Sequence, residues 1–93
     1  MSCWELKLKD VLELVAEVCN RLNISSDRFF LPNEWWDKTT LSLYVDTSDL
    51  VAEYGEEYNE YLARLVEIIV KKRLEKARVN AGRDFIEILI PLC

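Results

Sequence analysis

The second half of the chain holds two strand-like stretches that enclose a helical one, and this order constrains the fold more than any other feature. Thr40–Asp46 and residues 85–92 carry apolar side chains at alternate positions, which is the two-residue period of a half-buried strand. Residues 56–79 carry them at intervals of three and four, the period of an amphipathic helix. Residues 47–54 predict a short helix that ends at Gly55. We therefore expect a strand, a short helix, a long helix and a strand in succession.

Each predicted strand has one buried face and one partly exposed face. The buried faces are expected to consist of Leu41, Leu43, Val45, Ile86, Ile88, Ile90 and Leu92. In the last strand, Phe85 and Leu89 lie on the opposite face, with Glu87 between them. That face is either covered by the first helix or open to a second copy of the chain.

The first helix is predicted from Ser2 to Asn23. Ser2 and Glu5 have the spacing of a capping box, and an apolar stripe runs from Trp4 to Leu22. Asn23 can end the helix because asparagine tolerates the left-handed backbone conformation.

Residues 24–38 give weaker signals. Residues 28–31 form a short apolar run, and Pro32 after it favours a turn. A strand at residues 28–31 can then pair with residues 40–45. The expected fold class is therefore α/β, more closely a two-layer α+β domain over residues 1–93. Its order is helix, short strand, strand, short helix, long helix and strand, with two long helices on a sheet of two or three strands.

The formal net charge is −5 and is unevenly distributed. Residues 1–70 contain 14 acidic and 6 basic residues, and residues 71–93 contain 3 acidic and 6 basic residues. This balance disfavours a nucleic-acid-binding surface over the whole molecule but leaves one end locally positive.

The chain has no histidine, and no nucleophile beside a base stands out. We therefore expect no enzyme, no catalytic residue, no metal site, no cofactor and no small-molecule substrate. One alternative stays open: the carboxylate pairs Glu53/Glu57 and Glu56/Glu60, spaced i and i+4, would suit metal-assisted hydrolysis.

Cellular context is predicted from what the sequence lacks. No stretch has the roughly 20 apolar residues of a membrane span, and no basic segment precedes an apolar run at the start, so we expect a cytoplasmic protein without a membrane partner. Few glycines and many charged residues are typical of thermophiles, and the chain resembles small proteins of archaeal viruses and plasmids.

Cys3 and Cys19 lie about 24 Å apart on one predicted helix, too far for a disulfide between them. A bond between Cys19 and Cys93, a bond between two chains, and three reduced thiols all remain open.

The order of elements resembles the bacterial-type (type II) KH domain, in which a helix and a strand precede a strand–helix–helix–strand unit. This resemblance implies a nucleic-acid-binding Gly-x-x-Gly turn between the two core helices. The matching positions read Gly55-Glu56-Glu57-Tyr58. The last position is a bulky tyrosine, and the surrounding carboxylates repel phosphate, so the turn is degenerate and its RNA binding is expected to be lost.

Two groups of residues are candidates for function. The basic group, which could hold phosphates at the end of the long helix or simply complement its dipole, consists of Lys71, Lys72, Arg73, Lys76, Arg78 and Arg83. The apolar group, which could form a partner surface or close the core, consists of Phe29, Phe30, Trp35, Trp36, Phe85 and Leu89. The sequence favours a non-catalytic interaction protein, as a homodimer or with another protein partner. The alternative is a divergent KH-like nucleic-acid-binding protein that uses the basic group.

Overall fold

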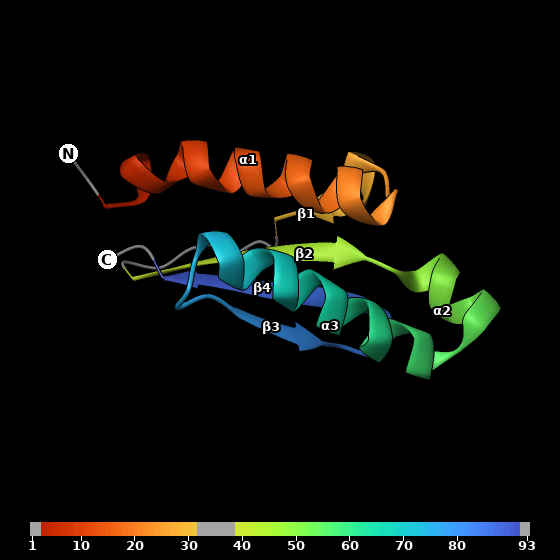
Figure 1. Ribbon diagram of the computed structural model, residues 1–93. Helices are drawn as coiled ribbons and strands as arrows, with labels where there is room; N and C mark the ends of the chain where they lie inside the picture. The colour runs from red at the N-terminus through yellow and green to blue at the C-terminus, as the bar shows by residue number, and fades with distance from the viewer. Residues whose placement is uncertain (1–2, 32–38, 92–93) are drawn as a thin grey trace.

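The computed structural model describes residues 3–31 and 39–91 (Figure 1). Its elements in chain order are α1 (Cys3–Leu22), the 3-10 helix η1 (Ser26–Arg28), β1 (Phe29–Phe30), β2 (Thr40–Asp46), α2 (Ser48–Tyr54), α3 (Glu56–Arg73), β3 (Arg78–Ala81) and β4 (Phe85–Pro91). The predicted α+β class is confirmed. Trp35 and Trp36 lie outside the described residues.

The four strands form one antiparallel sheet in the order β1-β2-β4-β3. The central pair runs from Thr40 opposite Pro91 to Asp46 opposite Phe85. At one edge β1 pairs with the end of β2, with Phe29 opposite Val45 and Phe30 opposite Tyr44. This confirms the expected pairing for these two residues, whereas Arg28 belongs to η1.

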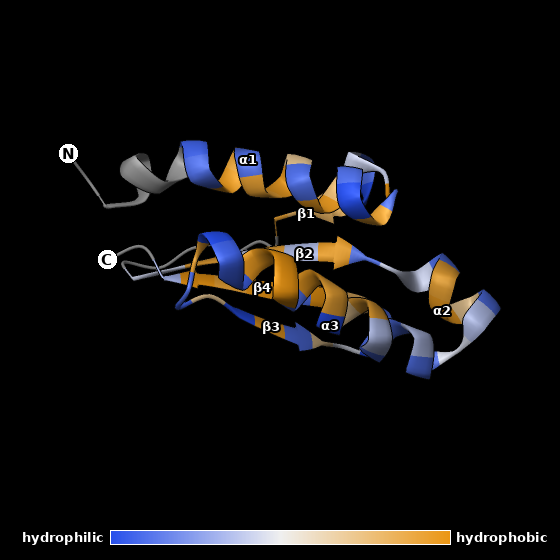
Figure 2. Ribbon diagram, in the orientation of Figure 1, coloured by the Kyte–Doolittle hydropathy of each residue, from blue (hydrophilic) through white to orange (hydrophobic). Residues whose placement is uncertain are grey.

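The long helices α1 and α3 pack on the same face of the sheet and form the core with it. Figure 2 shows the apolar side of α1 turned toward the strands, and the buried apolar residues of α3 belong to the same core. The largest core side chains with almost no exposed surface are Leu14, Val18, Val45, Val66, Val70, Ile86, Ile88 and Ile90. Burial of each such side chain contributes about 1.5–3 kcal/mol, so this face sets the stability of the fold.

Helix α1 ends as the sequence predicts. Asn23 has a φ of 55°, in the left-handed region, and the Ile24 amide donates to the Cys19 carbonyl at 3.1 Å. This bond spans the helix end and satisfies one of its free carbonyls. The thiol of Cys19 is partly buried, and this burial raises its pKa. Cys93 and the side chain of Cys3 lie outside the part of the chain that the structure describes.

The joint between α2 and α3 requires glycine. Gly55 has φ 92° and ψ 169°, a combination that is essentially confined to glycine. Its amide donates to the Val51 carbonyl at 2.8 Å and closes α2, and α3 begins at the next residue. The predicted end of the short helix at Gly55 is therefore confirmed.

The prediction that the long helix continues to residue 79 is wrong. Helix α3 ends at Arg73, and the chain turns and returns as β3, so the sheet has four strands instead of two or three. Leu74 and Ala77 are both buried, and their spacing continues the apolar stripe of α3. The same residues also fit a turn into a strand, so their spacing could not distinguish the two. This strand is an addition to the order of elements that the KH resemblance implies.

No helix in the described parts of the chain has both the length and the apolar character that a bilayer crossing requires.

Candidate functional site

The second face of the sheet has no described helix over it. We call it the open face, and it consists of Phe30, Thr40, Ser42, Tyr44, Asp46, Arg78, Asn80, Phe85, Glu87, Leu89 and Pro91. Along β2 and β4 these residues are half-buried or exposed, while their neighbours on the helix-covered face are buried.

Three aromatic rings from three strands meet on the open face. The rings of Tyr44 and Phe85 are stacked, with centroids 5.0 Å apart and an interplanar angle of 7°. Phe30 meets Tyr44 edge to face at 5.5 Å and 71°. Phe30 is 45% exposed, so a large part of its ring is available for contact.

The position of the Phe85 ring depends on Gly82 in the β3–β4 turn. A Cβ atom on Gly82 would lie 2.3 Å from the Phe85 ring, so the ring rests directly on the turn backbone. The Gly82 amide donates to the Phe85 carbonyl at 2.8 Å. The absence of a side chain at Gly82 therefore lets Phe85 reach its stack with Tyr44.

A carboxylate lies beside these aromatic rings. Glu87 is opposite Tyr44 on one side and opposite Asn80 on the other. The hydrogen bond with Glu87 raises the pKa of the Tyr44 hydroxyl, and Asn80 Nδ2 is 3.5 Å from Glu87 Oε1. No cation in the described parts of the chain pairs with Glu87.

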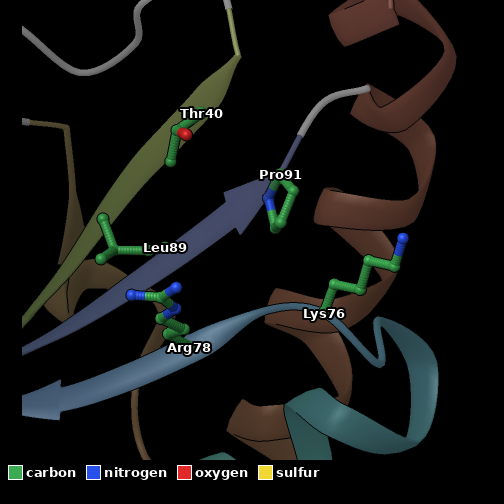
Figure 3. Close-up of a pocket in the computed structure, with 5 residues that line it drawn as sticks. All are labelled: Thr40, Lys76, Arg78, Leu89 and Pro91. Atoms are coloured by element: carbon green, nitrogen blue, oxygen red, sulfur yellow. The ribbon is translucent and has the colours of Figure 1, made fainter.

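One end of the open face is hollowed and basic. A concavity of about 580 Å³ is lined by Thr40, Lys76, Arg78, Leu89 and Pro91 (Figure 3). The Arg78 guanidinium lies toward Leu89, whereas the Lys76 amino group lies on the other side of Pro91. The two cations therefore do not converge on one point, as they would in a site for a small anion.

The structure brings together only part of the predicted apolar group. Phe30, Phe85 and Leu89 share the open face, whereas Phe29 lies on the helix-covered face and packs against the core. Tyr44 was missed as a candidate, although the alternation of β2 places it on the partly exposed face of the strand.

The predicted basic group does not form one surface. Arg73 bonds to Glu17 at 3.2 Å and to Glu13 at 3.1 Å, so it joins α3 to α1. Arg83 lies 3.6 Å from Glu56. The remaining members are exposed: Lys71 and Lys72 end α3, and Lys76 and Arg78 lie at the hollow.

The acidic turn between α2 and α3 is exposed. Glu53, Glu56 and Glu57 all lie at the surface, and no group of three or more potential metal ligands occurs within residues 3–31 and 39–91. Nearby, Arg28 donates two hydrogen bonds to the carboxylate of Asp49, from Nη1 to Oδ1 at 2.5 Å and from Nη2 to Oδ2 at 2.8 Å. This hydrogen bonding lowers the pKa of Asp49 to about 2. The acidic residues at the start of α3 complement its dipole.

Comparison with known proteins gives no match to a family model, to a curated protein or to a solved structure.

Proposed function

We propose that the protein is a non-catalytic interaction protein that forms a homodimer through the open face of its sheet. The observation that carries this proposal is the cluster of Phe30, Tyr44 and Phe85, which lies on the face that α1 and α3 leave uncovered. Exposed aromatic rings with polar groups around them are typical of protein contact surfaces.

The chemistry of the open face supports a contact role. Its side chains are aromatic and aliphatic groups, with hydroxyls and a few charges, rather than a nucleophile beside a base. Rings that are already fixed by stacking lose little conformational freedom on binding, so their burial contributes more to affinity.

The charges on the open face support a second copy as the partner. The face carries Arg78 as well as Glu87 and Asp46. A surface with one sign of charge repels its own copy, whereas a surface with both signs can be complementary to itself.

Sedimentation velocity over a wide range of protein concentration tests the proposal. We expect the 11.0 kDa chain to shift from monomer to dimer as concentration rises. Phe30→Ser should weaken the dimer by about tenfold or more, because it removes an exposed ring from the interface. The matched control is Ile68→Ser, which removes a side chain that is 57% exposed on α3, away from the sheet.

Two results would contradict the proposal. One is a wild-type chain that stays monomeric at every concentration. The other is equal weakening by Phe30→Ser and Ile68→Ser, which would place the contact elsewhere.

The alternative function is nucleic-acid binding by a divergent KH-like protein. The observation that favours it is the exposure of Lys71 and Lys72 at the end of α3, with no ion pair to either within the described residues. Arg73 already binds Glu13 and Glu17, which reduces the positive charge at the end of α3 that could bind phosphate.

Tryptophan fluorescence with single-stranded RNA separates the two functions. The alternative predicts saturable quenching that weakens steeply with salt and is lost in Lys71→Glu/Lys72→Glu. Sedimentation of the same variant should be unchanged if the open face forms the dimer, since neither lysine lies on it.

A further inference from the structure

The open face contains two neighbouring cross-strand rows with different chemistry. The register places Phe30, Tyr44, Glu87 and Asn80 side by side, and we call this the aromatic row. The next row consists of Ser42, Leu89 and Arg78, and we call it the arginine row. Among the residues that the structure describes, Glu87 in the aromatic row thus has no cation as a partner, and Arg78 in the arginine row has no carboxylate.

Any contact that covers the open face also covers the Glu87 carboxylate and must compensate for its lost solvation. In the monomer the carboxylate is half-exposed and still solvated, next to Tyr44 and Asn80. A second layer would remove that water, and a buried carboxylate without a cation is strongly unfavourable. The arrangement of the dimer therefore depends on which cation it brings to Glu87.

Two simple two-fold arrangements of face-to-face sheets can be compared. An axis parallel to the strands, between β2 and β4, places Glu87 over Tyr44 of the second copy and leaves it two strands, or about 10 Å sideways, from the second Arg78. The second axis also lies in the plane of the interface but runs perpendicular to the strands, between the two rows. It places each aromatic row over the arginine row of the other copy. Glu87 then lies one strand, or about 4.8 Å sideways, from the second Arg78.

We infer that the homodimer has its two-fold axis perpendicular to the strands, between the aromatic row and the arginine row, and that Arg78 of each copy pairs with Glu87 of the other. This inference rests on the proposed function, since it specifies how two copies meet through the open face. A flexible arginine side chain can span the remaining offset and reach both carboxylate oxygens.

The same axis also matches the rest of the face. Tyr44 of the aromatic row lies over Ser42 of the second copy's arginine row. Phe85 and Pro91 belong to the rows on either side of these two, and the axis places Phe85 of one copy over Pro91 of the other. Phe85 and Pro91 thus bring apolar groups together at both ends of the contact, and the two ion pairs, related by the axis, lie between them next to the edge strand β3.

Two charge-reversed variants, Arg78→Glu and Glu87→Lys, test the arrangement. In each variant alone, both cross-copy pairs become like-charged, and we expect dimer affinity to fall by about a hundredfold or more. Mixing the variants should restore association, since both contacts in the mixed dimer join opposite charges. Native mass spectrometry distinguishes the mixed dimer from either homodimer by its mass.

The mixed dimer also excludes a simpler explanation. If each substitution only disturbed contacts within its own chain, mixing would restore nothing. The double variant Arg78→Glu/Glu87→Lys should dimerise by itself for the same reason as the mixture does. Unfolding curves of each variant show that the chain remains folded.

Failure of this inference can be distinguished from failure of the proposed function. A wild-type dimer that Phe30→Ser disrupts, but that survives Arg78→Glu and Glu87→Lys unchanged, would overturn the axis and leave the open face as the interface. Two monomeric variants that do not combine would likewise overturn the pairing. A monomeric wild-type chain would overturn both.

Discussion

The hydroxyl of Thr47 donates to Oδ1 of Asn59 at 2.6 Å in the most deeply buried polar contact among the described residues. Asn59 Nδ2 in turn donates to the carbonyls of Gly82 and Phe85, at 2.9 and 3.0 Å. One side chain of α3 therefore joins the end of β2 to the β3–β4 turn, which carries the Phe85 ring of the open face.

Replacing Asn59 with alanine should destabilise the fold by about 3 kcal/mol, because it leaves buried polar groups without partners. Urea unfolding at a fixed protein concentration measures this loss. The control is Asn20→Ala, at an exposed position of α1, which should change the unfolding free energy by about 0.5 kcal/mol or less. Similar small changes in both variants would show that the network contributes little.

Gly55→Ala should cost about 1–3 kcal/mol, since the backbone there has a positive φ with an extended ψ. There is space for the new methyl group, as nothing lies within 4 Å of it, so the cost is one of backbone strain alone. Asn23→Gly provides the contrast: its φ of 55° suits glycine, and we expect little change. Thermal unfolding of the two variants compares them directly, and an unaffected Gly55→Ala would contradict the geometry of the joint.

Gly82→Ala should displace the Phe85 ring and break its stack with Tyr44. The displacement should appear as changed NMR shifts of the Tyr44 ring, with a cost of about 1–3 kcal/mol in stability. In a Phe85→Leu background the same alanine should cost less, because the ring that it meets is gone. Equal costs in the two backgrounds would mean that Gly82 is required for another reason.

Arg28→Ala should return the Asp49 pKa from about 2 to the ordinary range near 3.9, since the bidentate hydrogen bond that lowers it is removed. A lowered pKa in the folded state means that the Arg28–Asp49 contact stabilises the fold above the unfolded pKa. That stabilisation is lost as pH falls through about 2. An NMR titration of the Asp49 carboxyl measures the shift. Arg21→Ala, whose partner is Glu17, should leave Asp49 unchanged.

Some of the site follows from the sequence, and some of it does not. Alternation places Phe85 and Leu89 together on the less buried face of β4, and this prediction needs only the geometry of a strand. The meeting of Phe30, Tyr44 and Phe85 depends on register across three strands. Local periodicity carries no information about register, so Tyr44 did not stand out. Phe29 and Phe30 are separated for a simpler reason, because adjacent residues of a strand point to opposite faces.

The basic group shows the same limit. Clustering along the sequence from Lys71 to Arg83 suggested one surface, yet α3 ends within this segment and the chain reverses. Arg73 turns to α1, Arg83 lies near Glu56, and Arg78 joins the open face. The partners that separate them lie far away in the chain and become visible only when the elements pack.

The sequence by itself determined the local structure of this protein: the two central strands, the helices, and the helix ends at Asn23 and Gly55. Side-chain period and backbone sterics act over a few residues, so a short segment specifies them. The tertiary structure alone decided that residues 78–81 become a strand, because that choice depends on hydrogen bonds to β4. It also decided which face of the sheet the described helices leave uncovered, since α1 and α3 both bury their apolar stripes on the other face.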